Sequence, residues 1–150
     1  MSQDQNKISG RRENRIAAMQ FLYMRQANGD EPLEDALSVF FETREKPRQY
    51  YAFAEELISG CLNNLPEIDA AIASSTRNWS MDRIAKVELA ILRLAVFELL
   101  HRPDIPPVVS INEAIDIAKT FAGAESRRFV NGILDNIKGG LSRPPRTAQK

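Results

Sequence analysis

The chain is 150 residues long, and its 20 basic residues balance its 20 acidic residues to a formal net charge of zero. This length allows one domain, or two small lobes that share an interface, to bury a core without disulfide bonds. The single cysteine, Cys61, excludes an internal disulfide, and the polar residues 1–15 exclude a signal peptide, so we expect a cytoplasmic protein that is not attached to a membrane.

Apolar residues recur at helical spacing along the first half of the chain, and the alternation typical of strands is nearly absent. Residues 1–9 are expected to form a flexible terminus. The first helix is predicted over about 11–27, because the pair Asn28-Gly29 favours a helix end. A second helix is predicted from Pro32, and a third after the break at Pro47. Residues 63–66 favour a hinge, so we expect lobes over about 10–64 and 65–137.

The second half is predicted to contain four further helices. One spans about 66–74, and the next, about 82–100, is apolar on nearly every side and should be the buried central helix. Prolines interrupt residues 102–107, and the following helix should start at Ser110 with a capping box closed by Glu113. The last helix is predicted over about 125–137, and residues 138–150 should form a flexible basic tail. The expected fold is all-α, with about seven helices.

The residue types needed for catalysis or metal binding are scarce. The single histidine, His101, stands at a predicted helix C-terminus, where the helix dipole favours a cation. Cys61 lies in an apolar stripe without a nearby histidine base, so core packing explains it better than catalysis does. One histidine and one cysteine do not make a zinc site, and the glycines form no phosphate-binding loop. We therefore predict no enzyme, no metal and no cofactor.

Arginines cluster at the starts of two predicted helices. Arg11, Arg12 and Arg15 fall in the opening turns of the first helix, and Arg127 and Arg128 in the first turn of the last. Cations there oppose the helix dipole, each at a cost of about 0.3–1 kcal/mol. An anion at the helix start would remove that cost, and guanidinium groups match phosphate geometry. Both clusters are candidate phosphate sites; ordinary solvated surfaces are the alternative.

Two residues after the second cluster bear on this hypothesis. Phe129 follows the arginines directly and leaves two interpretations open: it belongs to the core, or it stacks on an unpaired base of single-stranded RNA. Gly132, inside the same helix, costs about 1 kcal/mol relative to alanine. We therefore expect a neighbouring helix or a ligand to approach the backbone at Gly132 closely.

Three blocks of the sequence carry a family resemblance. The first is RRENR at 11–15, followed by QFLY at 20–23, and the second is LRLAVFEL at 92–99. The third is PVVSINEA at 107–114, followed by AK at 118–119 and FVNGILD at 129–135. In this order, over about residues 10–137, the blocks resemble the NusB family of bacterial transcription antitermination factors.

The resemblance implies two helical bundles side by side in a non-catalytic factor. It implies binding of boxA-type single-stranded RNA together with the small ribosomal protein NusE, in the transcription elongation complex that makes ribosomal RNA. In the family, the arginine-rich helix start and the segment before FVNG face RNA. The residues carried over are Arg11, Arg12, Arg15, Glu125, Arg127, Arg128 and Phe129 for RNA, and Tyr23 and Glu88 for the protein partner. The family contains monomers and dimers, so a homodimer remains open.

Two alternative functions remain at the level of sequence. Domains of similar sequence stand at the front of ribosomal RNA cytosine methyltransferases, where they help a catalytic domain to hold RNA. A helical adaptor that binds only proteins is the other alternative. Replacing Arg12 and Arg15 with glutamate would distinguish this adaptor from an RNA-binding factor. In an RNA-binding factor, RNA binding would collapse while protein binding survived.

Overall fold

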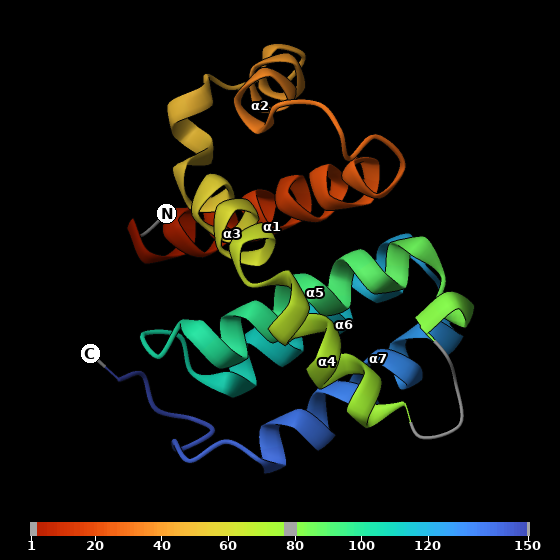
Figure 1. Cartoon of the computed structure of the whole chain (residues 1–150). Helices are drawn as coiled ribbons and strands as arrows, with labels where there is room; N and C mark the ends of the chain where they lie inside the picture. The colour runs from red at the N-terminus through yellow and green to blue at the C-terminus, as the bar shows by residue number, and fades with distance from the viewer. Residues whose placement is uncertain (1–2, 77–80, 150) are drawn as a thin grey trace.

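The computed structural model describes residues 3–76 and 81–149, and all regular secondary structure in them is helical (Figure 1). In chain order the elements are α1 (Gln3–Ala27), α2 (Leu33–Glu42), the 3₁₀ turn η1 (Arg48–Tyr51), α3 (Ala52–Asn63), α4 (Leu65–Ser75), the 3₁₀ turn η2 (Met81–Arg83), α5 (Lys86–His101), α6 (Pro107–Phe121) and α7 (Ala124–Gly139). The predicted all-α class with about seven helices is therefore confirmed.

Two helix starts differ from the prediction. Helix α1 begins at Gln3, so residues 3–9 are helical and not an unstructured terminus; residues 1–2 lie outside the described residues. Helix α6 begins at Pro107, whose fixed backbone angle and missing N–H suit a first helical position. Ser110 and Glu113 are therefore interior helix residues, and the capping box predicted between them does not form.

Helix α5 is the centre of the molecule. It packs against α1 and α3 on one side and against α4, α6 and α7 on the other, so the helices form two groups around it (Figure 1). Nearly every residue from Ala90 to Leu99 is buried, with Arg93 as the exception. This encirclement explains why the α5 sequence is apolar on all sides. Asn64 is the single residue between α3 and α4, at the predicted boundary of the lobes.

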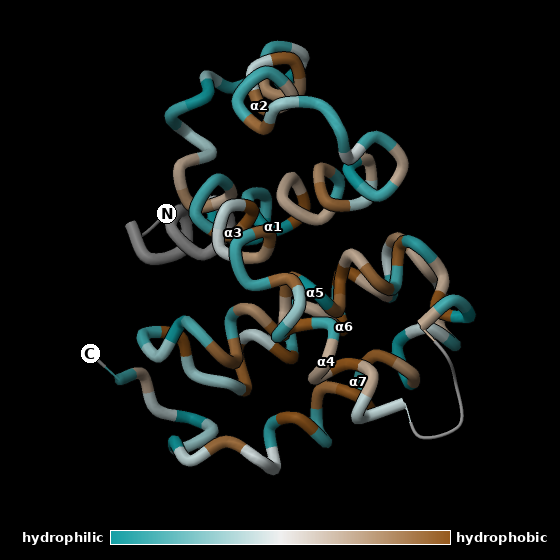
Figure 2. Tube along the Cα trace, viewed as in Figure 1, coloured by the Kyte–Doolittle hydropathy of each residue, from teal (hydrophilic) through white to brown (hydrophobic). Residues whose placement is uncertain are grey.

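Aromatic side chains attach α2 to the rest of the first group. The rings of Phe21 and Phe40 meet edge to face at 5.4 Å, and those of Phe41 and Tyr51 stack at 5.2 Å. Both arrangements are favoured by the quadrupoles of the rings. The segment that joins α2 to η1 is hydrophilic (Figure 2), and Arg48 of η1 also bonds to Glu34 and Ser38 of α2.

A glycine permits the close contact between α3 and α5. A Cβ atom built on Gly60 would lie 2.0 Å from Cζ of Phe97. The Phe97 ring therefore occupies the space that a larger residue at position 60 would need. Helices α3 and α5 approach closely here because residue 60 has no side chain.

The C-terminal segment is docked, contrary to the predicted flexible tail. Helix α7 continues to Gly139, and the chain then turns back over the start of α6. The Arg143 guanidinium donates to the carbonyl oxygens of Ile105 at 2.8 Å and Leu99 at 2.9 Å. The backbone N–H of Val108 donates to the carbonyl of Pro145 at 2.9 Å. The segment thus satisfies free backbone groups at the end of α5 and at the start of α6.

Candidate nucleic-acid interface

Arg15 is a core residue, which corrects its prediction as an RNA contact. Its relative exposure is 3%, and its Nε and Nη2 donate to the two carboxylate oxygens of Glu98 at 2.9 Å each. Ser110 donates a third hydrogen bond to Glu98 Oε1 at 2.8 Å. The donors of Arg15 that face a carboxylate are thus occupied by a buried partner, and an external strand does not reach the guanidinium.

Arg12 lies on the surface and is oriented by two carboxylates of α6. Its Nε and Nη2 donate to Glu113 at 2.8 and 3.2 Å, and Nη2 also donates to Asp116 at 2.8 Å. The side chain is still 47% exposed. The hydrogen bond and attraction to Glu113, together with Asp116, raise the pKa of Arg12 above its ordinary value. Nη1 has no partner among the described residues, so this donor of the half-exposed Arg12 side chain is not used within the protein.

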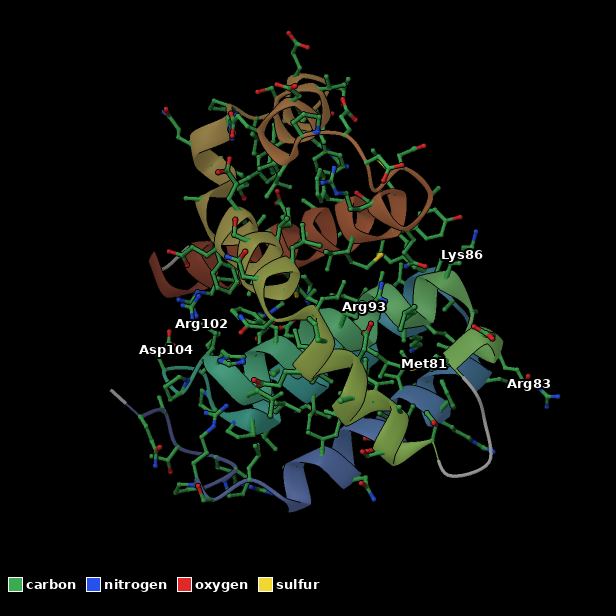
Figure 3. All side chains as sticks on the ribbon, viewed as in Figure 1. Met81, Arg83, Lys86, Arg93, Arg102 and Asp104 are labelled. Carbon is green, nitrogen blue, oxygen red and sulfur yellow. The ribbon has the colours of Figure 1, made fainter. Side chains whose placement is uncertain are left out.

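In α1 the arginines do not lie at the helix start, so the helix dipole creates no anion site beside them. Because α1 begins at Gln3, Arg11 and Arg12 lie in its third turn, where the backbone N–H groups already have partners. Arg11 is instead part of an arginine cluster on Phe53, with the guanidinium carbon 4.6 Å from the ring centroid. Arg102 lies 5.4 Å from the same ring and bonds to Asp104 at 2.9 Å; both are labelled near the start of α1 in Figure 3. The pKa of Asp104 is lowered by this hydrogen bond.

The start of α7 has the predicted geometry. Gly123, with φ of +96°, ends the tight turn after α6, and α7 begins at Ala124. Glu125, Arg127 and Arg128 are exposed, and the two arginines donate no hydrogen bond to a described residue. Cations therefore stand without carboxylate partners beside the free N–H groups of a helix start. That arrangement is suited to an anion.

Phe129 and Gly132 lie further along α7. Phe129 is half-buried and packs against the hydrophobic core, so the core interpretation describes most of the side chain. Among the described residues, a Cβ atom on Gly132 would meet nothing within 4 Å, so of the two expected alternatives the neighbouring helix is not found there and the ligand stays a prediction. Glu125, Arg128 and Gly132 are spaced three and four residues apart and therefore share one exposed face of α7.

The two predicted partner-facing residues come from neighbouring elements. Tyr23 is 43% exposed in the last turns of α1, and Glu88 is half-buried in the first turn of α5. Gln26 donates to the carbonyl of Lys86 at 2.9 Å and so joins these two helix ends. Glu88 accepts a hydrogen bond from the backbone N–H of Ala85 at 3.2 Å, which fixes the start of α5.

The remaining reactive side chains have structural surroundings. His101 bonds to Glu67 at 2.8 Å, and its ring stacks on Phe97. Burial raises the pKa of the Cys61 thiol, with a further contribution from Glu98. In residues 3–76 and 81–149, no group of three or more metal-ligating side chains comes together. Likewise, no helix in these ranges is both long and apolar enough to cross a bilayer.

The comparison with known families agrees with this architecture. The sequence profile of the NusB family matches residues 12–138. The chain belongs to the NusB family. A transcription antitermination protein NusB from Geobacter sp. (strain M21) is 49% identical over 141 residues, covering 87% of this chain and 94% of the relative.

Solved structures of the NusB family share the fold. T. maritima NusB superposes with a TM-score of 0.78 at 39% identity, covering 89% of this chain and 93% of that one. A structure of the antitermination factors NusB and NusE in complex with dsRNA superposes with a TM-score of 0.77 at 29% identity, covering 89% and 98%.

Sequence reasoning missed two features of this NusB-family surface. The first is the role of Glu113 and Asp116, which orient Arg12 from a helix about one hundred positions away in sequence. Only the i, i+3 spacing of the two acids signalled a shared face. The second is that no described helix covers the backbone of Gly132, where the sequence left a helix and a ligand open as alternatives.

Proposed function

We propose that this NusB-family chain is a non-catalytic RNA-binding antitermination factor that acts in the cytoplasm, within the transcription elongation complex. The proposed ligands are boxA-type RNA and the small ribosomal protein NusE. The observation that carries the proposal is the placement of outward-facing arginines of α1 and α7 at the two ends of the last turns of α6.

The spacing of these arginines follows from the bonds of α6. Arg12 bonds to Asp116, and five residues later α6 ends at Phe121. At about 1.5 Å per residue this is a rise of about 7.5 Å. The next residues, 122–123, form the turn into α7, where Arg127 and Arg128 follow within the first five residues. One strand could therefore contact α1 and α7 without leaving the surface of α6.

The face of α7 offers more than charge. Beside Arg128, no side chain of the described residues covers the backbone at Gly132, so a sugar or base can approach it closely, and half-buried Phe129 is our candidate for stacking on a base. Glu125 can accept a hydrogen bond from a base edge at the same place. We assign phosphate binding to Arg11, Arg12, Arg127 and Arg128, and we omit Arg15 because it is buried.

The protein partner has a separate surface in this proposal. Tyr23 and Glu88 lie where the end of α1 meets the start of α5, whereas Arg12 lies more than two turns earlier in α1. Of the solved relatives, one is described as NusB and NusE in complex with dsRNA. We infer that NusE binds at Tyr23 and Glu88 and that RNA binds along α6 and α7, so that each ligand increases the affinity for the other.

Fluorescence anisotropy with labelled boxA-type RNA, with and without the NusE protein of the same organism, tests the proposal. Four phosphate contacts to a single strand predict a log–log salt slope of about −3. The Arg127→Gln/Arg128→Gln variant should bind RNA more weakly and show a flatter slope, whereas the exposed Arg83→Gln control should match the wild type. Equal binding by both variants would contradict the assigned surface, and a duplex of the same sequence tests the preference for single strands.

The same titration distinguishes the proposed RNA-binding factor from an adaptor that binds only proteins. An adaptor would bind NusE normally but would show no RNA affinity above that of an unrelated RNA. The Tyr23→Asp variant provides the converse control, because it should lose NusE binding while it keeps RNA binding in the absence of NusE. Loss of both activities in this variant would contradict two separate surfaces.

A further inference from the structure

A cavity of about 340 Å³ lies where α1 to α5 meet, away from the proposed RNA surface. Its apolar walls come from Leu22, Leu33, Leu62 and Leu65, one from each of four helices. Arg93, visible between α4 and α5 in Figure 3, closes one side. Helices α3 and α4 lie in front of α5, whereas α6 lies behind it (Figure 1).

The cavity contains one guanidinium group whose donors are unused. Arg93 is neutralised by Asp69, to which its Nε and Nη2 donate at 2.9 Å each. Arg25, also on the wall, is half-buried and donates no hydrogen bond to a described residue; its Nη1 is covered by protein atoms, so the remaining guanidinium donors are the ones available to the cavity. A guanidinium beside apolar walls, with donors that no described residue uses, is suited to a ligand acceptor, because hydrogen bonds to charged donors are strong.

We propose that this cavity binds a small carboxylic acid with a branched apolar body, the leucines enclosing the body and Arg25 binding the carboxylate. The volume lies at the lower end of the range for ligand pockets, and junctions between packed units are a common place for them. A planar guanidinium and a carboxylate can form two parallel hydrogen bonds, which gives the polar end its specificity. Because Asp69 already neutralises Arg93, we assign the carboxylate to Arg25 alone.

The test is an NMR titration of the ¹⁵N-labelled protein with N-acetyl-L-leucine, and with N-acetyl-L-leucinamide as the uncharged analogue. We expect shifts at the amides of Leu22, Arg25, Gly29 and Leu65, and an affinity for the acid about tenfold above that for the amide. In Arg25→Gln the preference should fall to within about twofold. The exposed cation variant Arg83→Gln is the matched control and should retain the full preference.

Three outcomes would overturn the proposal. One is equal affinity for acid and amide in the wild type, and another is a preference that survives in Arg25→Gln. The third concerns the source of the carboxylate: an acetylated tetrapeptide that ends in leucine should bind no better than N-acetyl-L-leucine. If the peptide bound more than about tenfold tighter, the cavity would be a site for a protein C-terminus and not for a small acid.

Discussion

Arg15 and Glu98 form a bidentate ion pair in the buried contact between α1 and α5. Both Arg15 donors lie 2.9 Å from the Glu98 oxygens, and the two side chains are 4% and 1% exposed. Arg15 belongs to α1 and Glu98 to α5, and Ser110 of α6 bonds to the same carboxylate. One buried carboxylate therefore connects three helices, and its full set of hydrogen bonds makes the burial of two charges tolerable.

The Glu98→Gln variant should lose about 3–5 kcal/mol of unfolding free energy, because it leaves the Arg15 charge buried without a counter-charge. Urea denaturation followed by circular dichroism measures this loss. The double variant Arg15→Met/Glu98→Leu removes both charges and should recover most of the stability. A loss below about 1 kcal/mol in the single variant would contradict the structural role of the pair.

The helical fold was predictable from the spacing of apolar residues, but the helix ends were less so. The all-around apolar α5 indicated its central place, because a helix enclosed by neighbours has no polar face. The start of α6 was misplaced because the capping pattern at Ser110 and Glu113 is only local. In the folded chain Ser110 bonds to Glu98 and Glu113 to Arg12, contacts that no local pattern reveals.

The candidate site was predictable where it depended on one helix start and unpredictable where it depended on tertiary partners. The sequence around residue 125 predicted the start of the last helix, and Arg127 and Arg128 do lie in the opening turns of α7. In the sequence Arg15 looks equivalent to Arg12, because both lie within the predicted first helix and are three residues apart. Their exposure differs because Arg15 bonds to Glu98 in the core, whereas Arg12 bonds to α6 at the surface.

The Gly60→Ala variant should be destabilised by about 1–3 kcal/mol, because the new methyl group would overlap the Phe97 ring. The ring must move, and it is itself packed in the core between α3 and α5. Thermal denaturation measures the change. The Gly60→Ala/Phe97→Leu double variant, in which a smaller side chain gives space to the methyl group, should lose less than the sum of the two single variants. Strict additivity would contradict the contact.

The Asp116→Asn variant should bind RNA more tightly than the wild type, by about two- to fivefold at low salt. Asp116 is 55% exposed beside Arg12, so its carboxylate repels a phosphate at that position. Glu113 alone holds Arg12 through two donors, so the orientation of the guanidinium should persist. Arg12→Gln should change the affinity in the opposite direction. RNA titrations at two salt concentrations test both, and equal effects of the two variants would contradict the assignment.

The Arg143→Gln variant should lower the unfolding free energy by about 1–3 kcal/mol, because the carbonyls of Ile105 and Leu99 lose their charged donor. The docked segment should then detach from the start of α6. Hydrogen exchange at the amide of Val108, which donates to Pro145, should accelerate in the variant. Arg146→Gln, at an exposed position of the same segment, is the control and should leave both measurements unchanged.

The Gly132→Ala variant should separate stability from RNA binding. Alanine in place of an interior helical glycine should add about 0.5–1 kcal/mol of unfolding free energy, and its methyl group would meet no atom of the described residues within 4 Å. If RNA approaches the backbone of α7 at this position, the same methyl group should weaken RNA binding several-fold. Gly139→Ala, also open but at the end of α7, should leave RNA affinity unchanged. A Gly132→Ala variant that is more stable and binds RNA like the wild type would show that the strand does not cross α7 there.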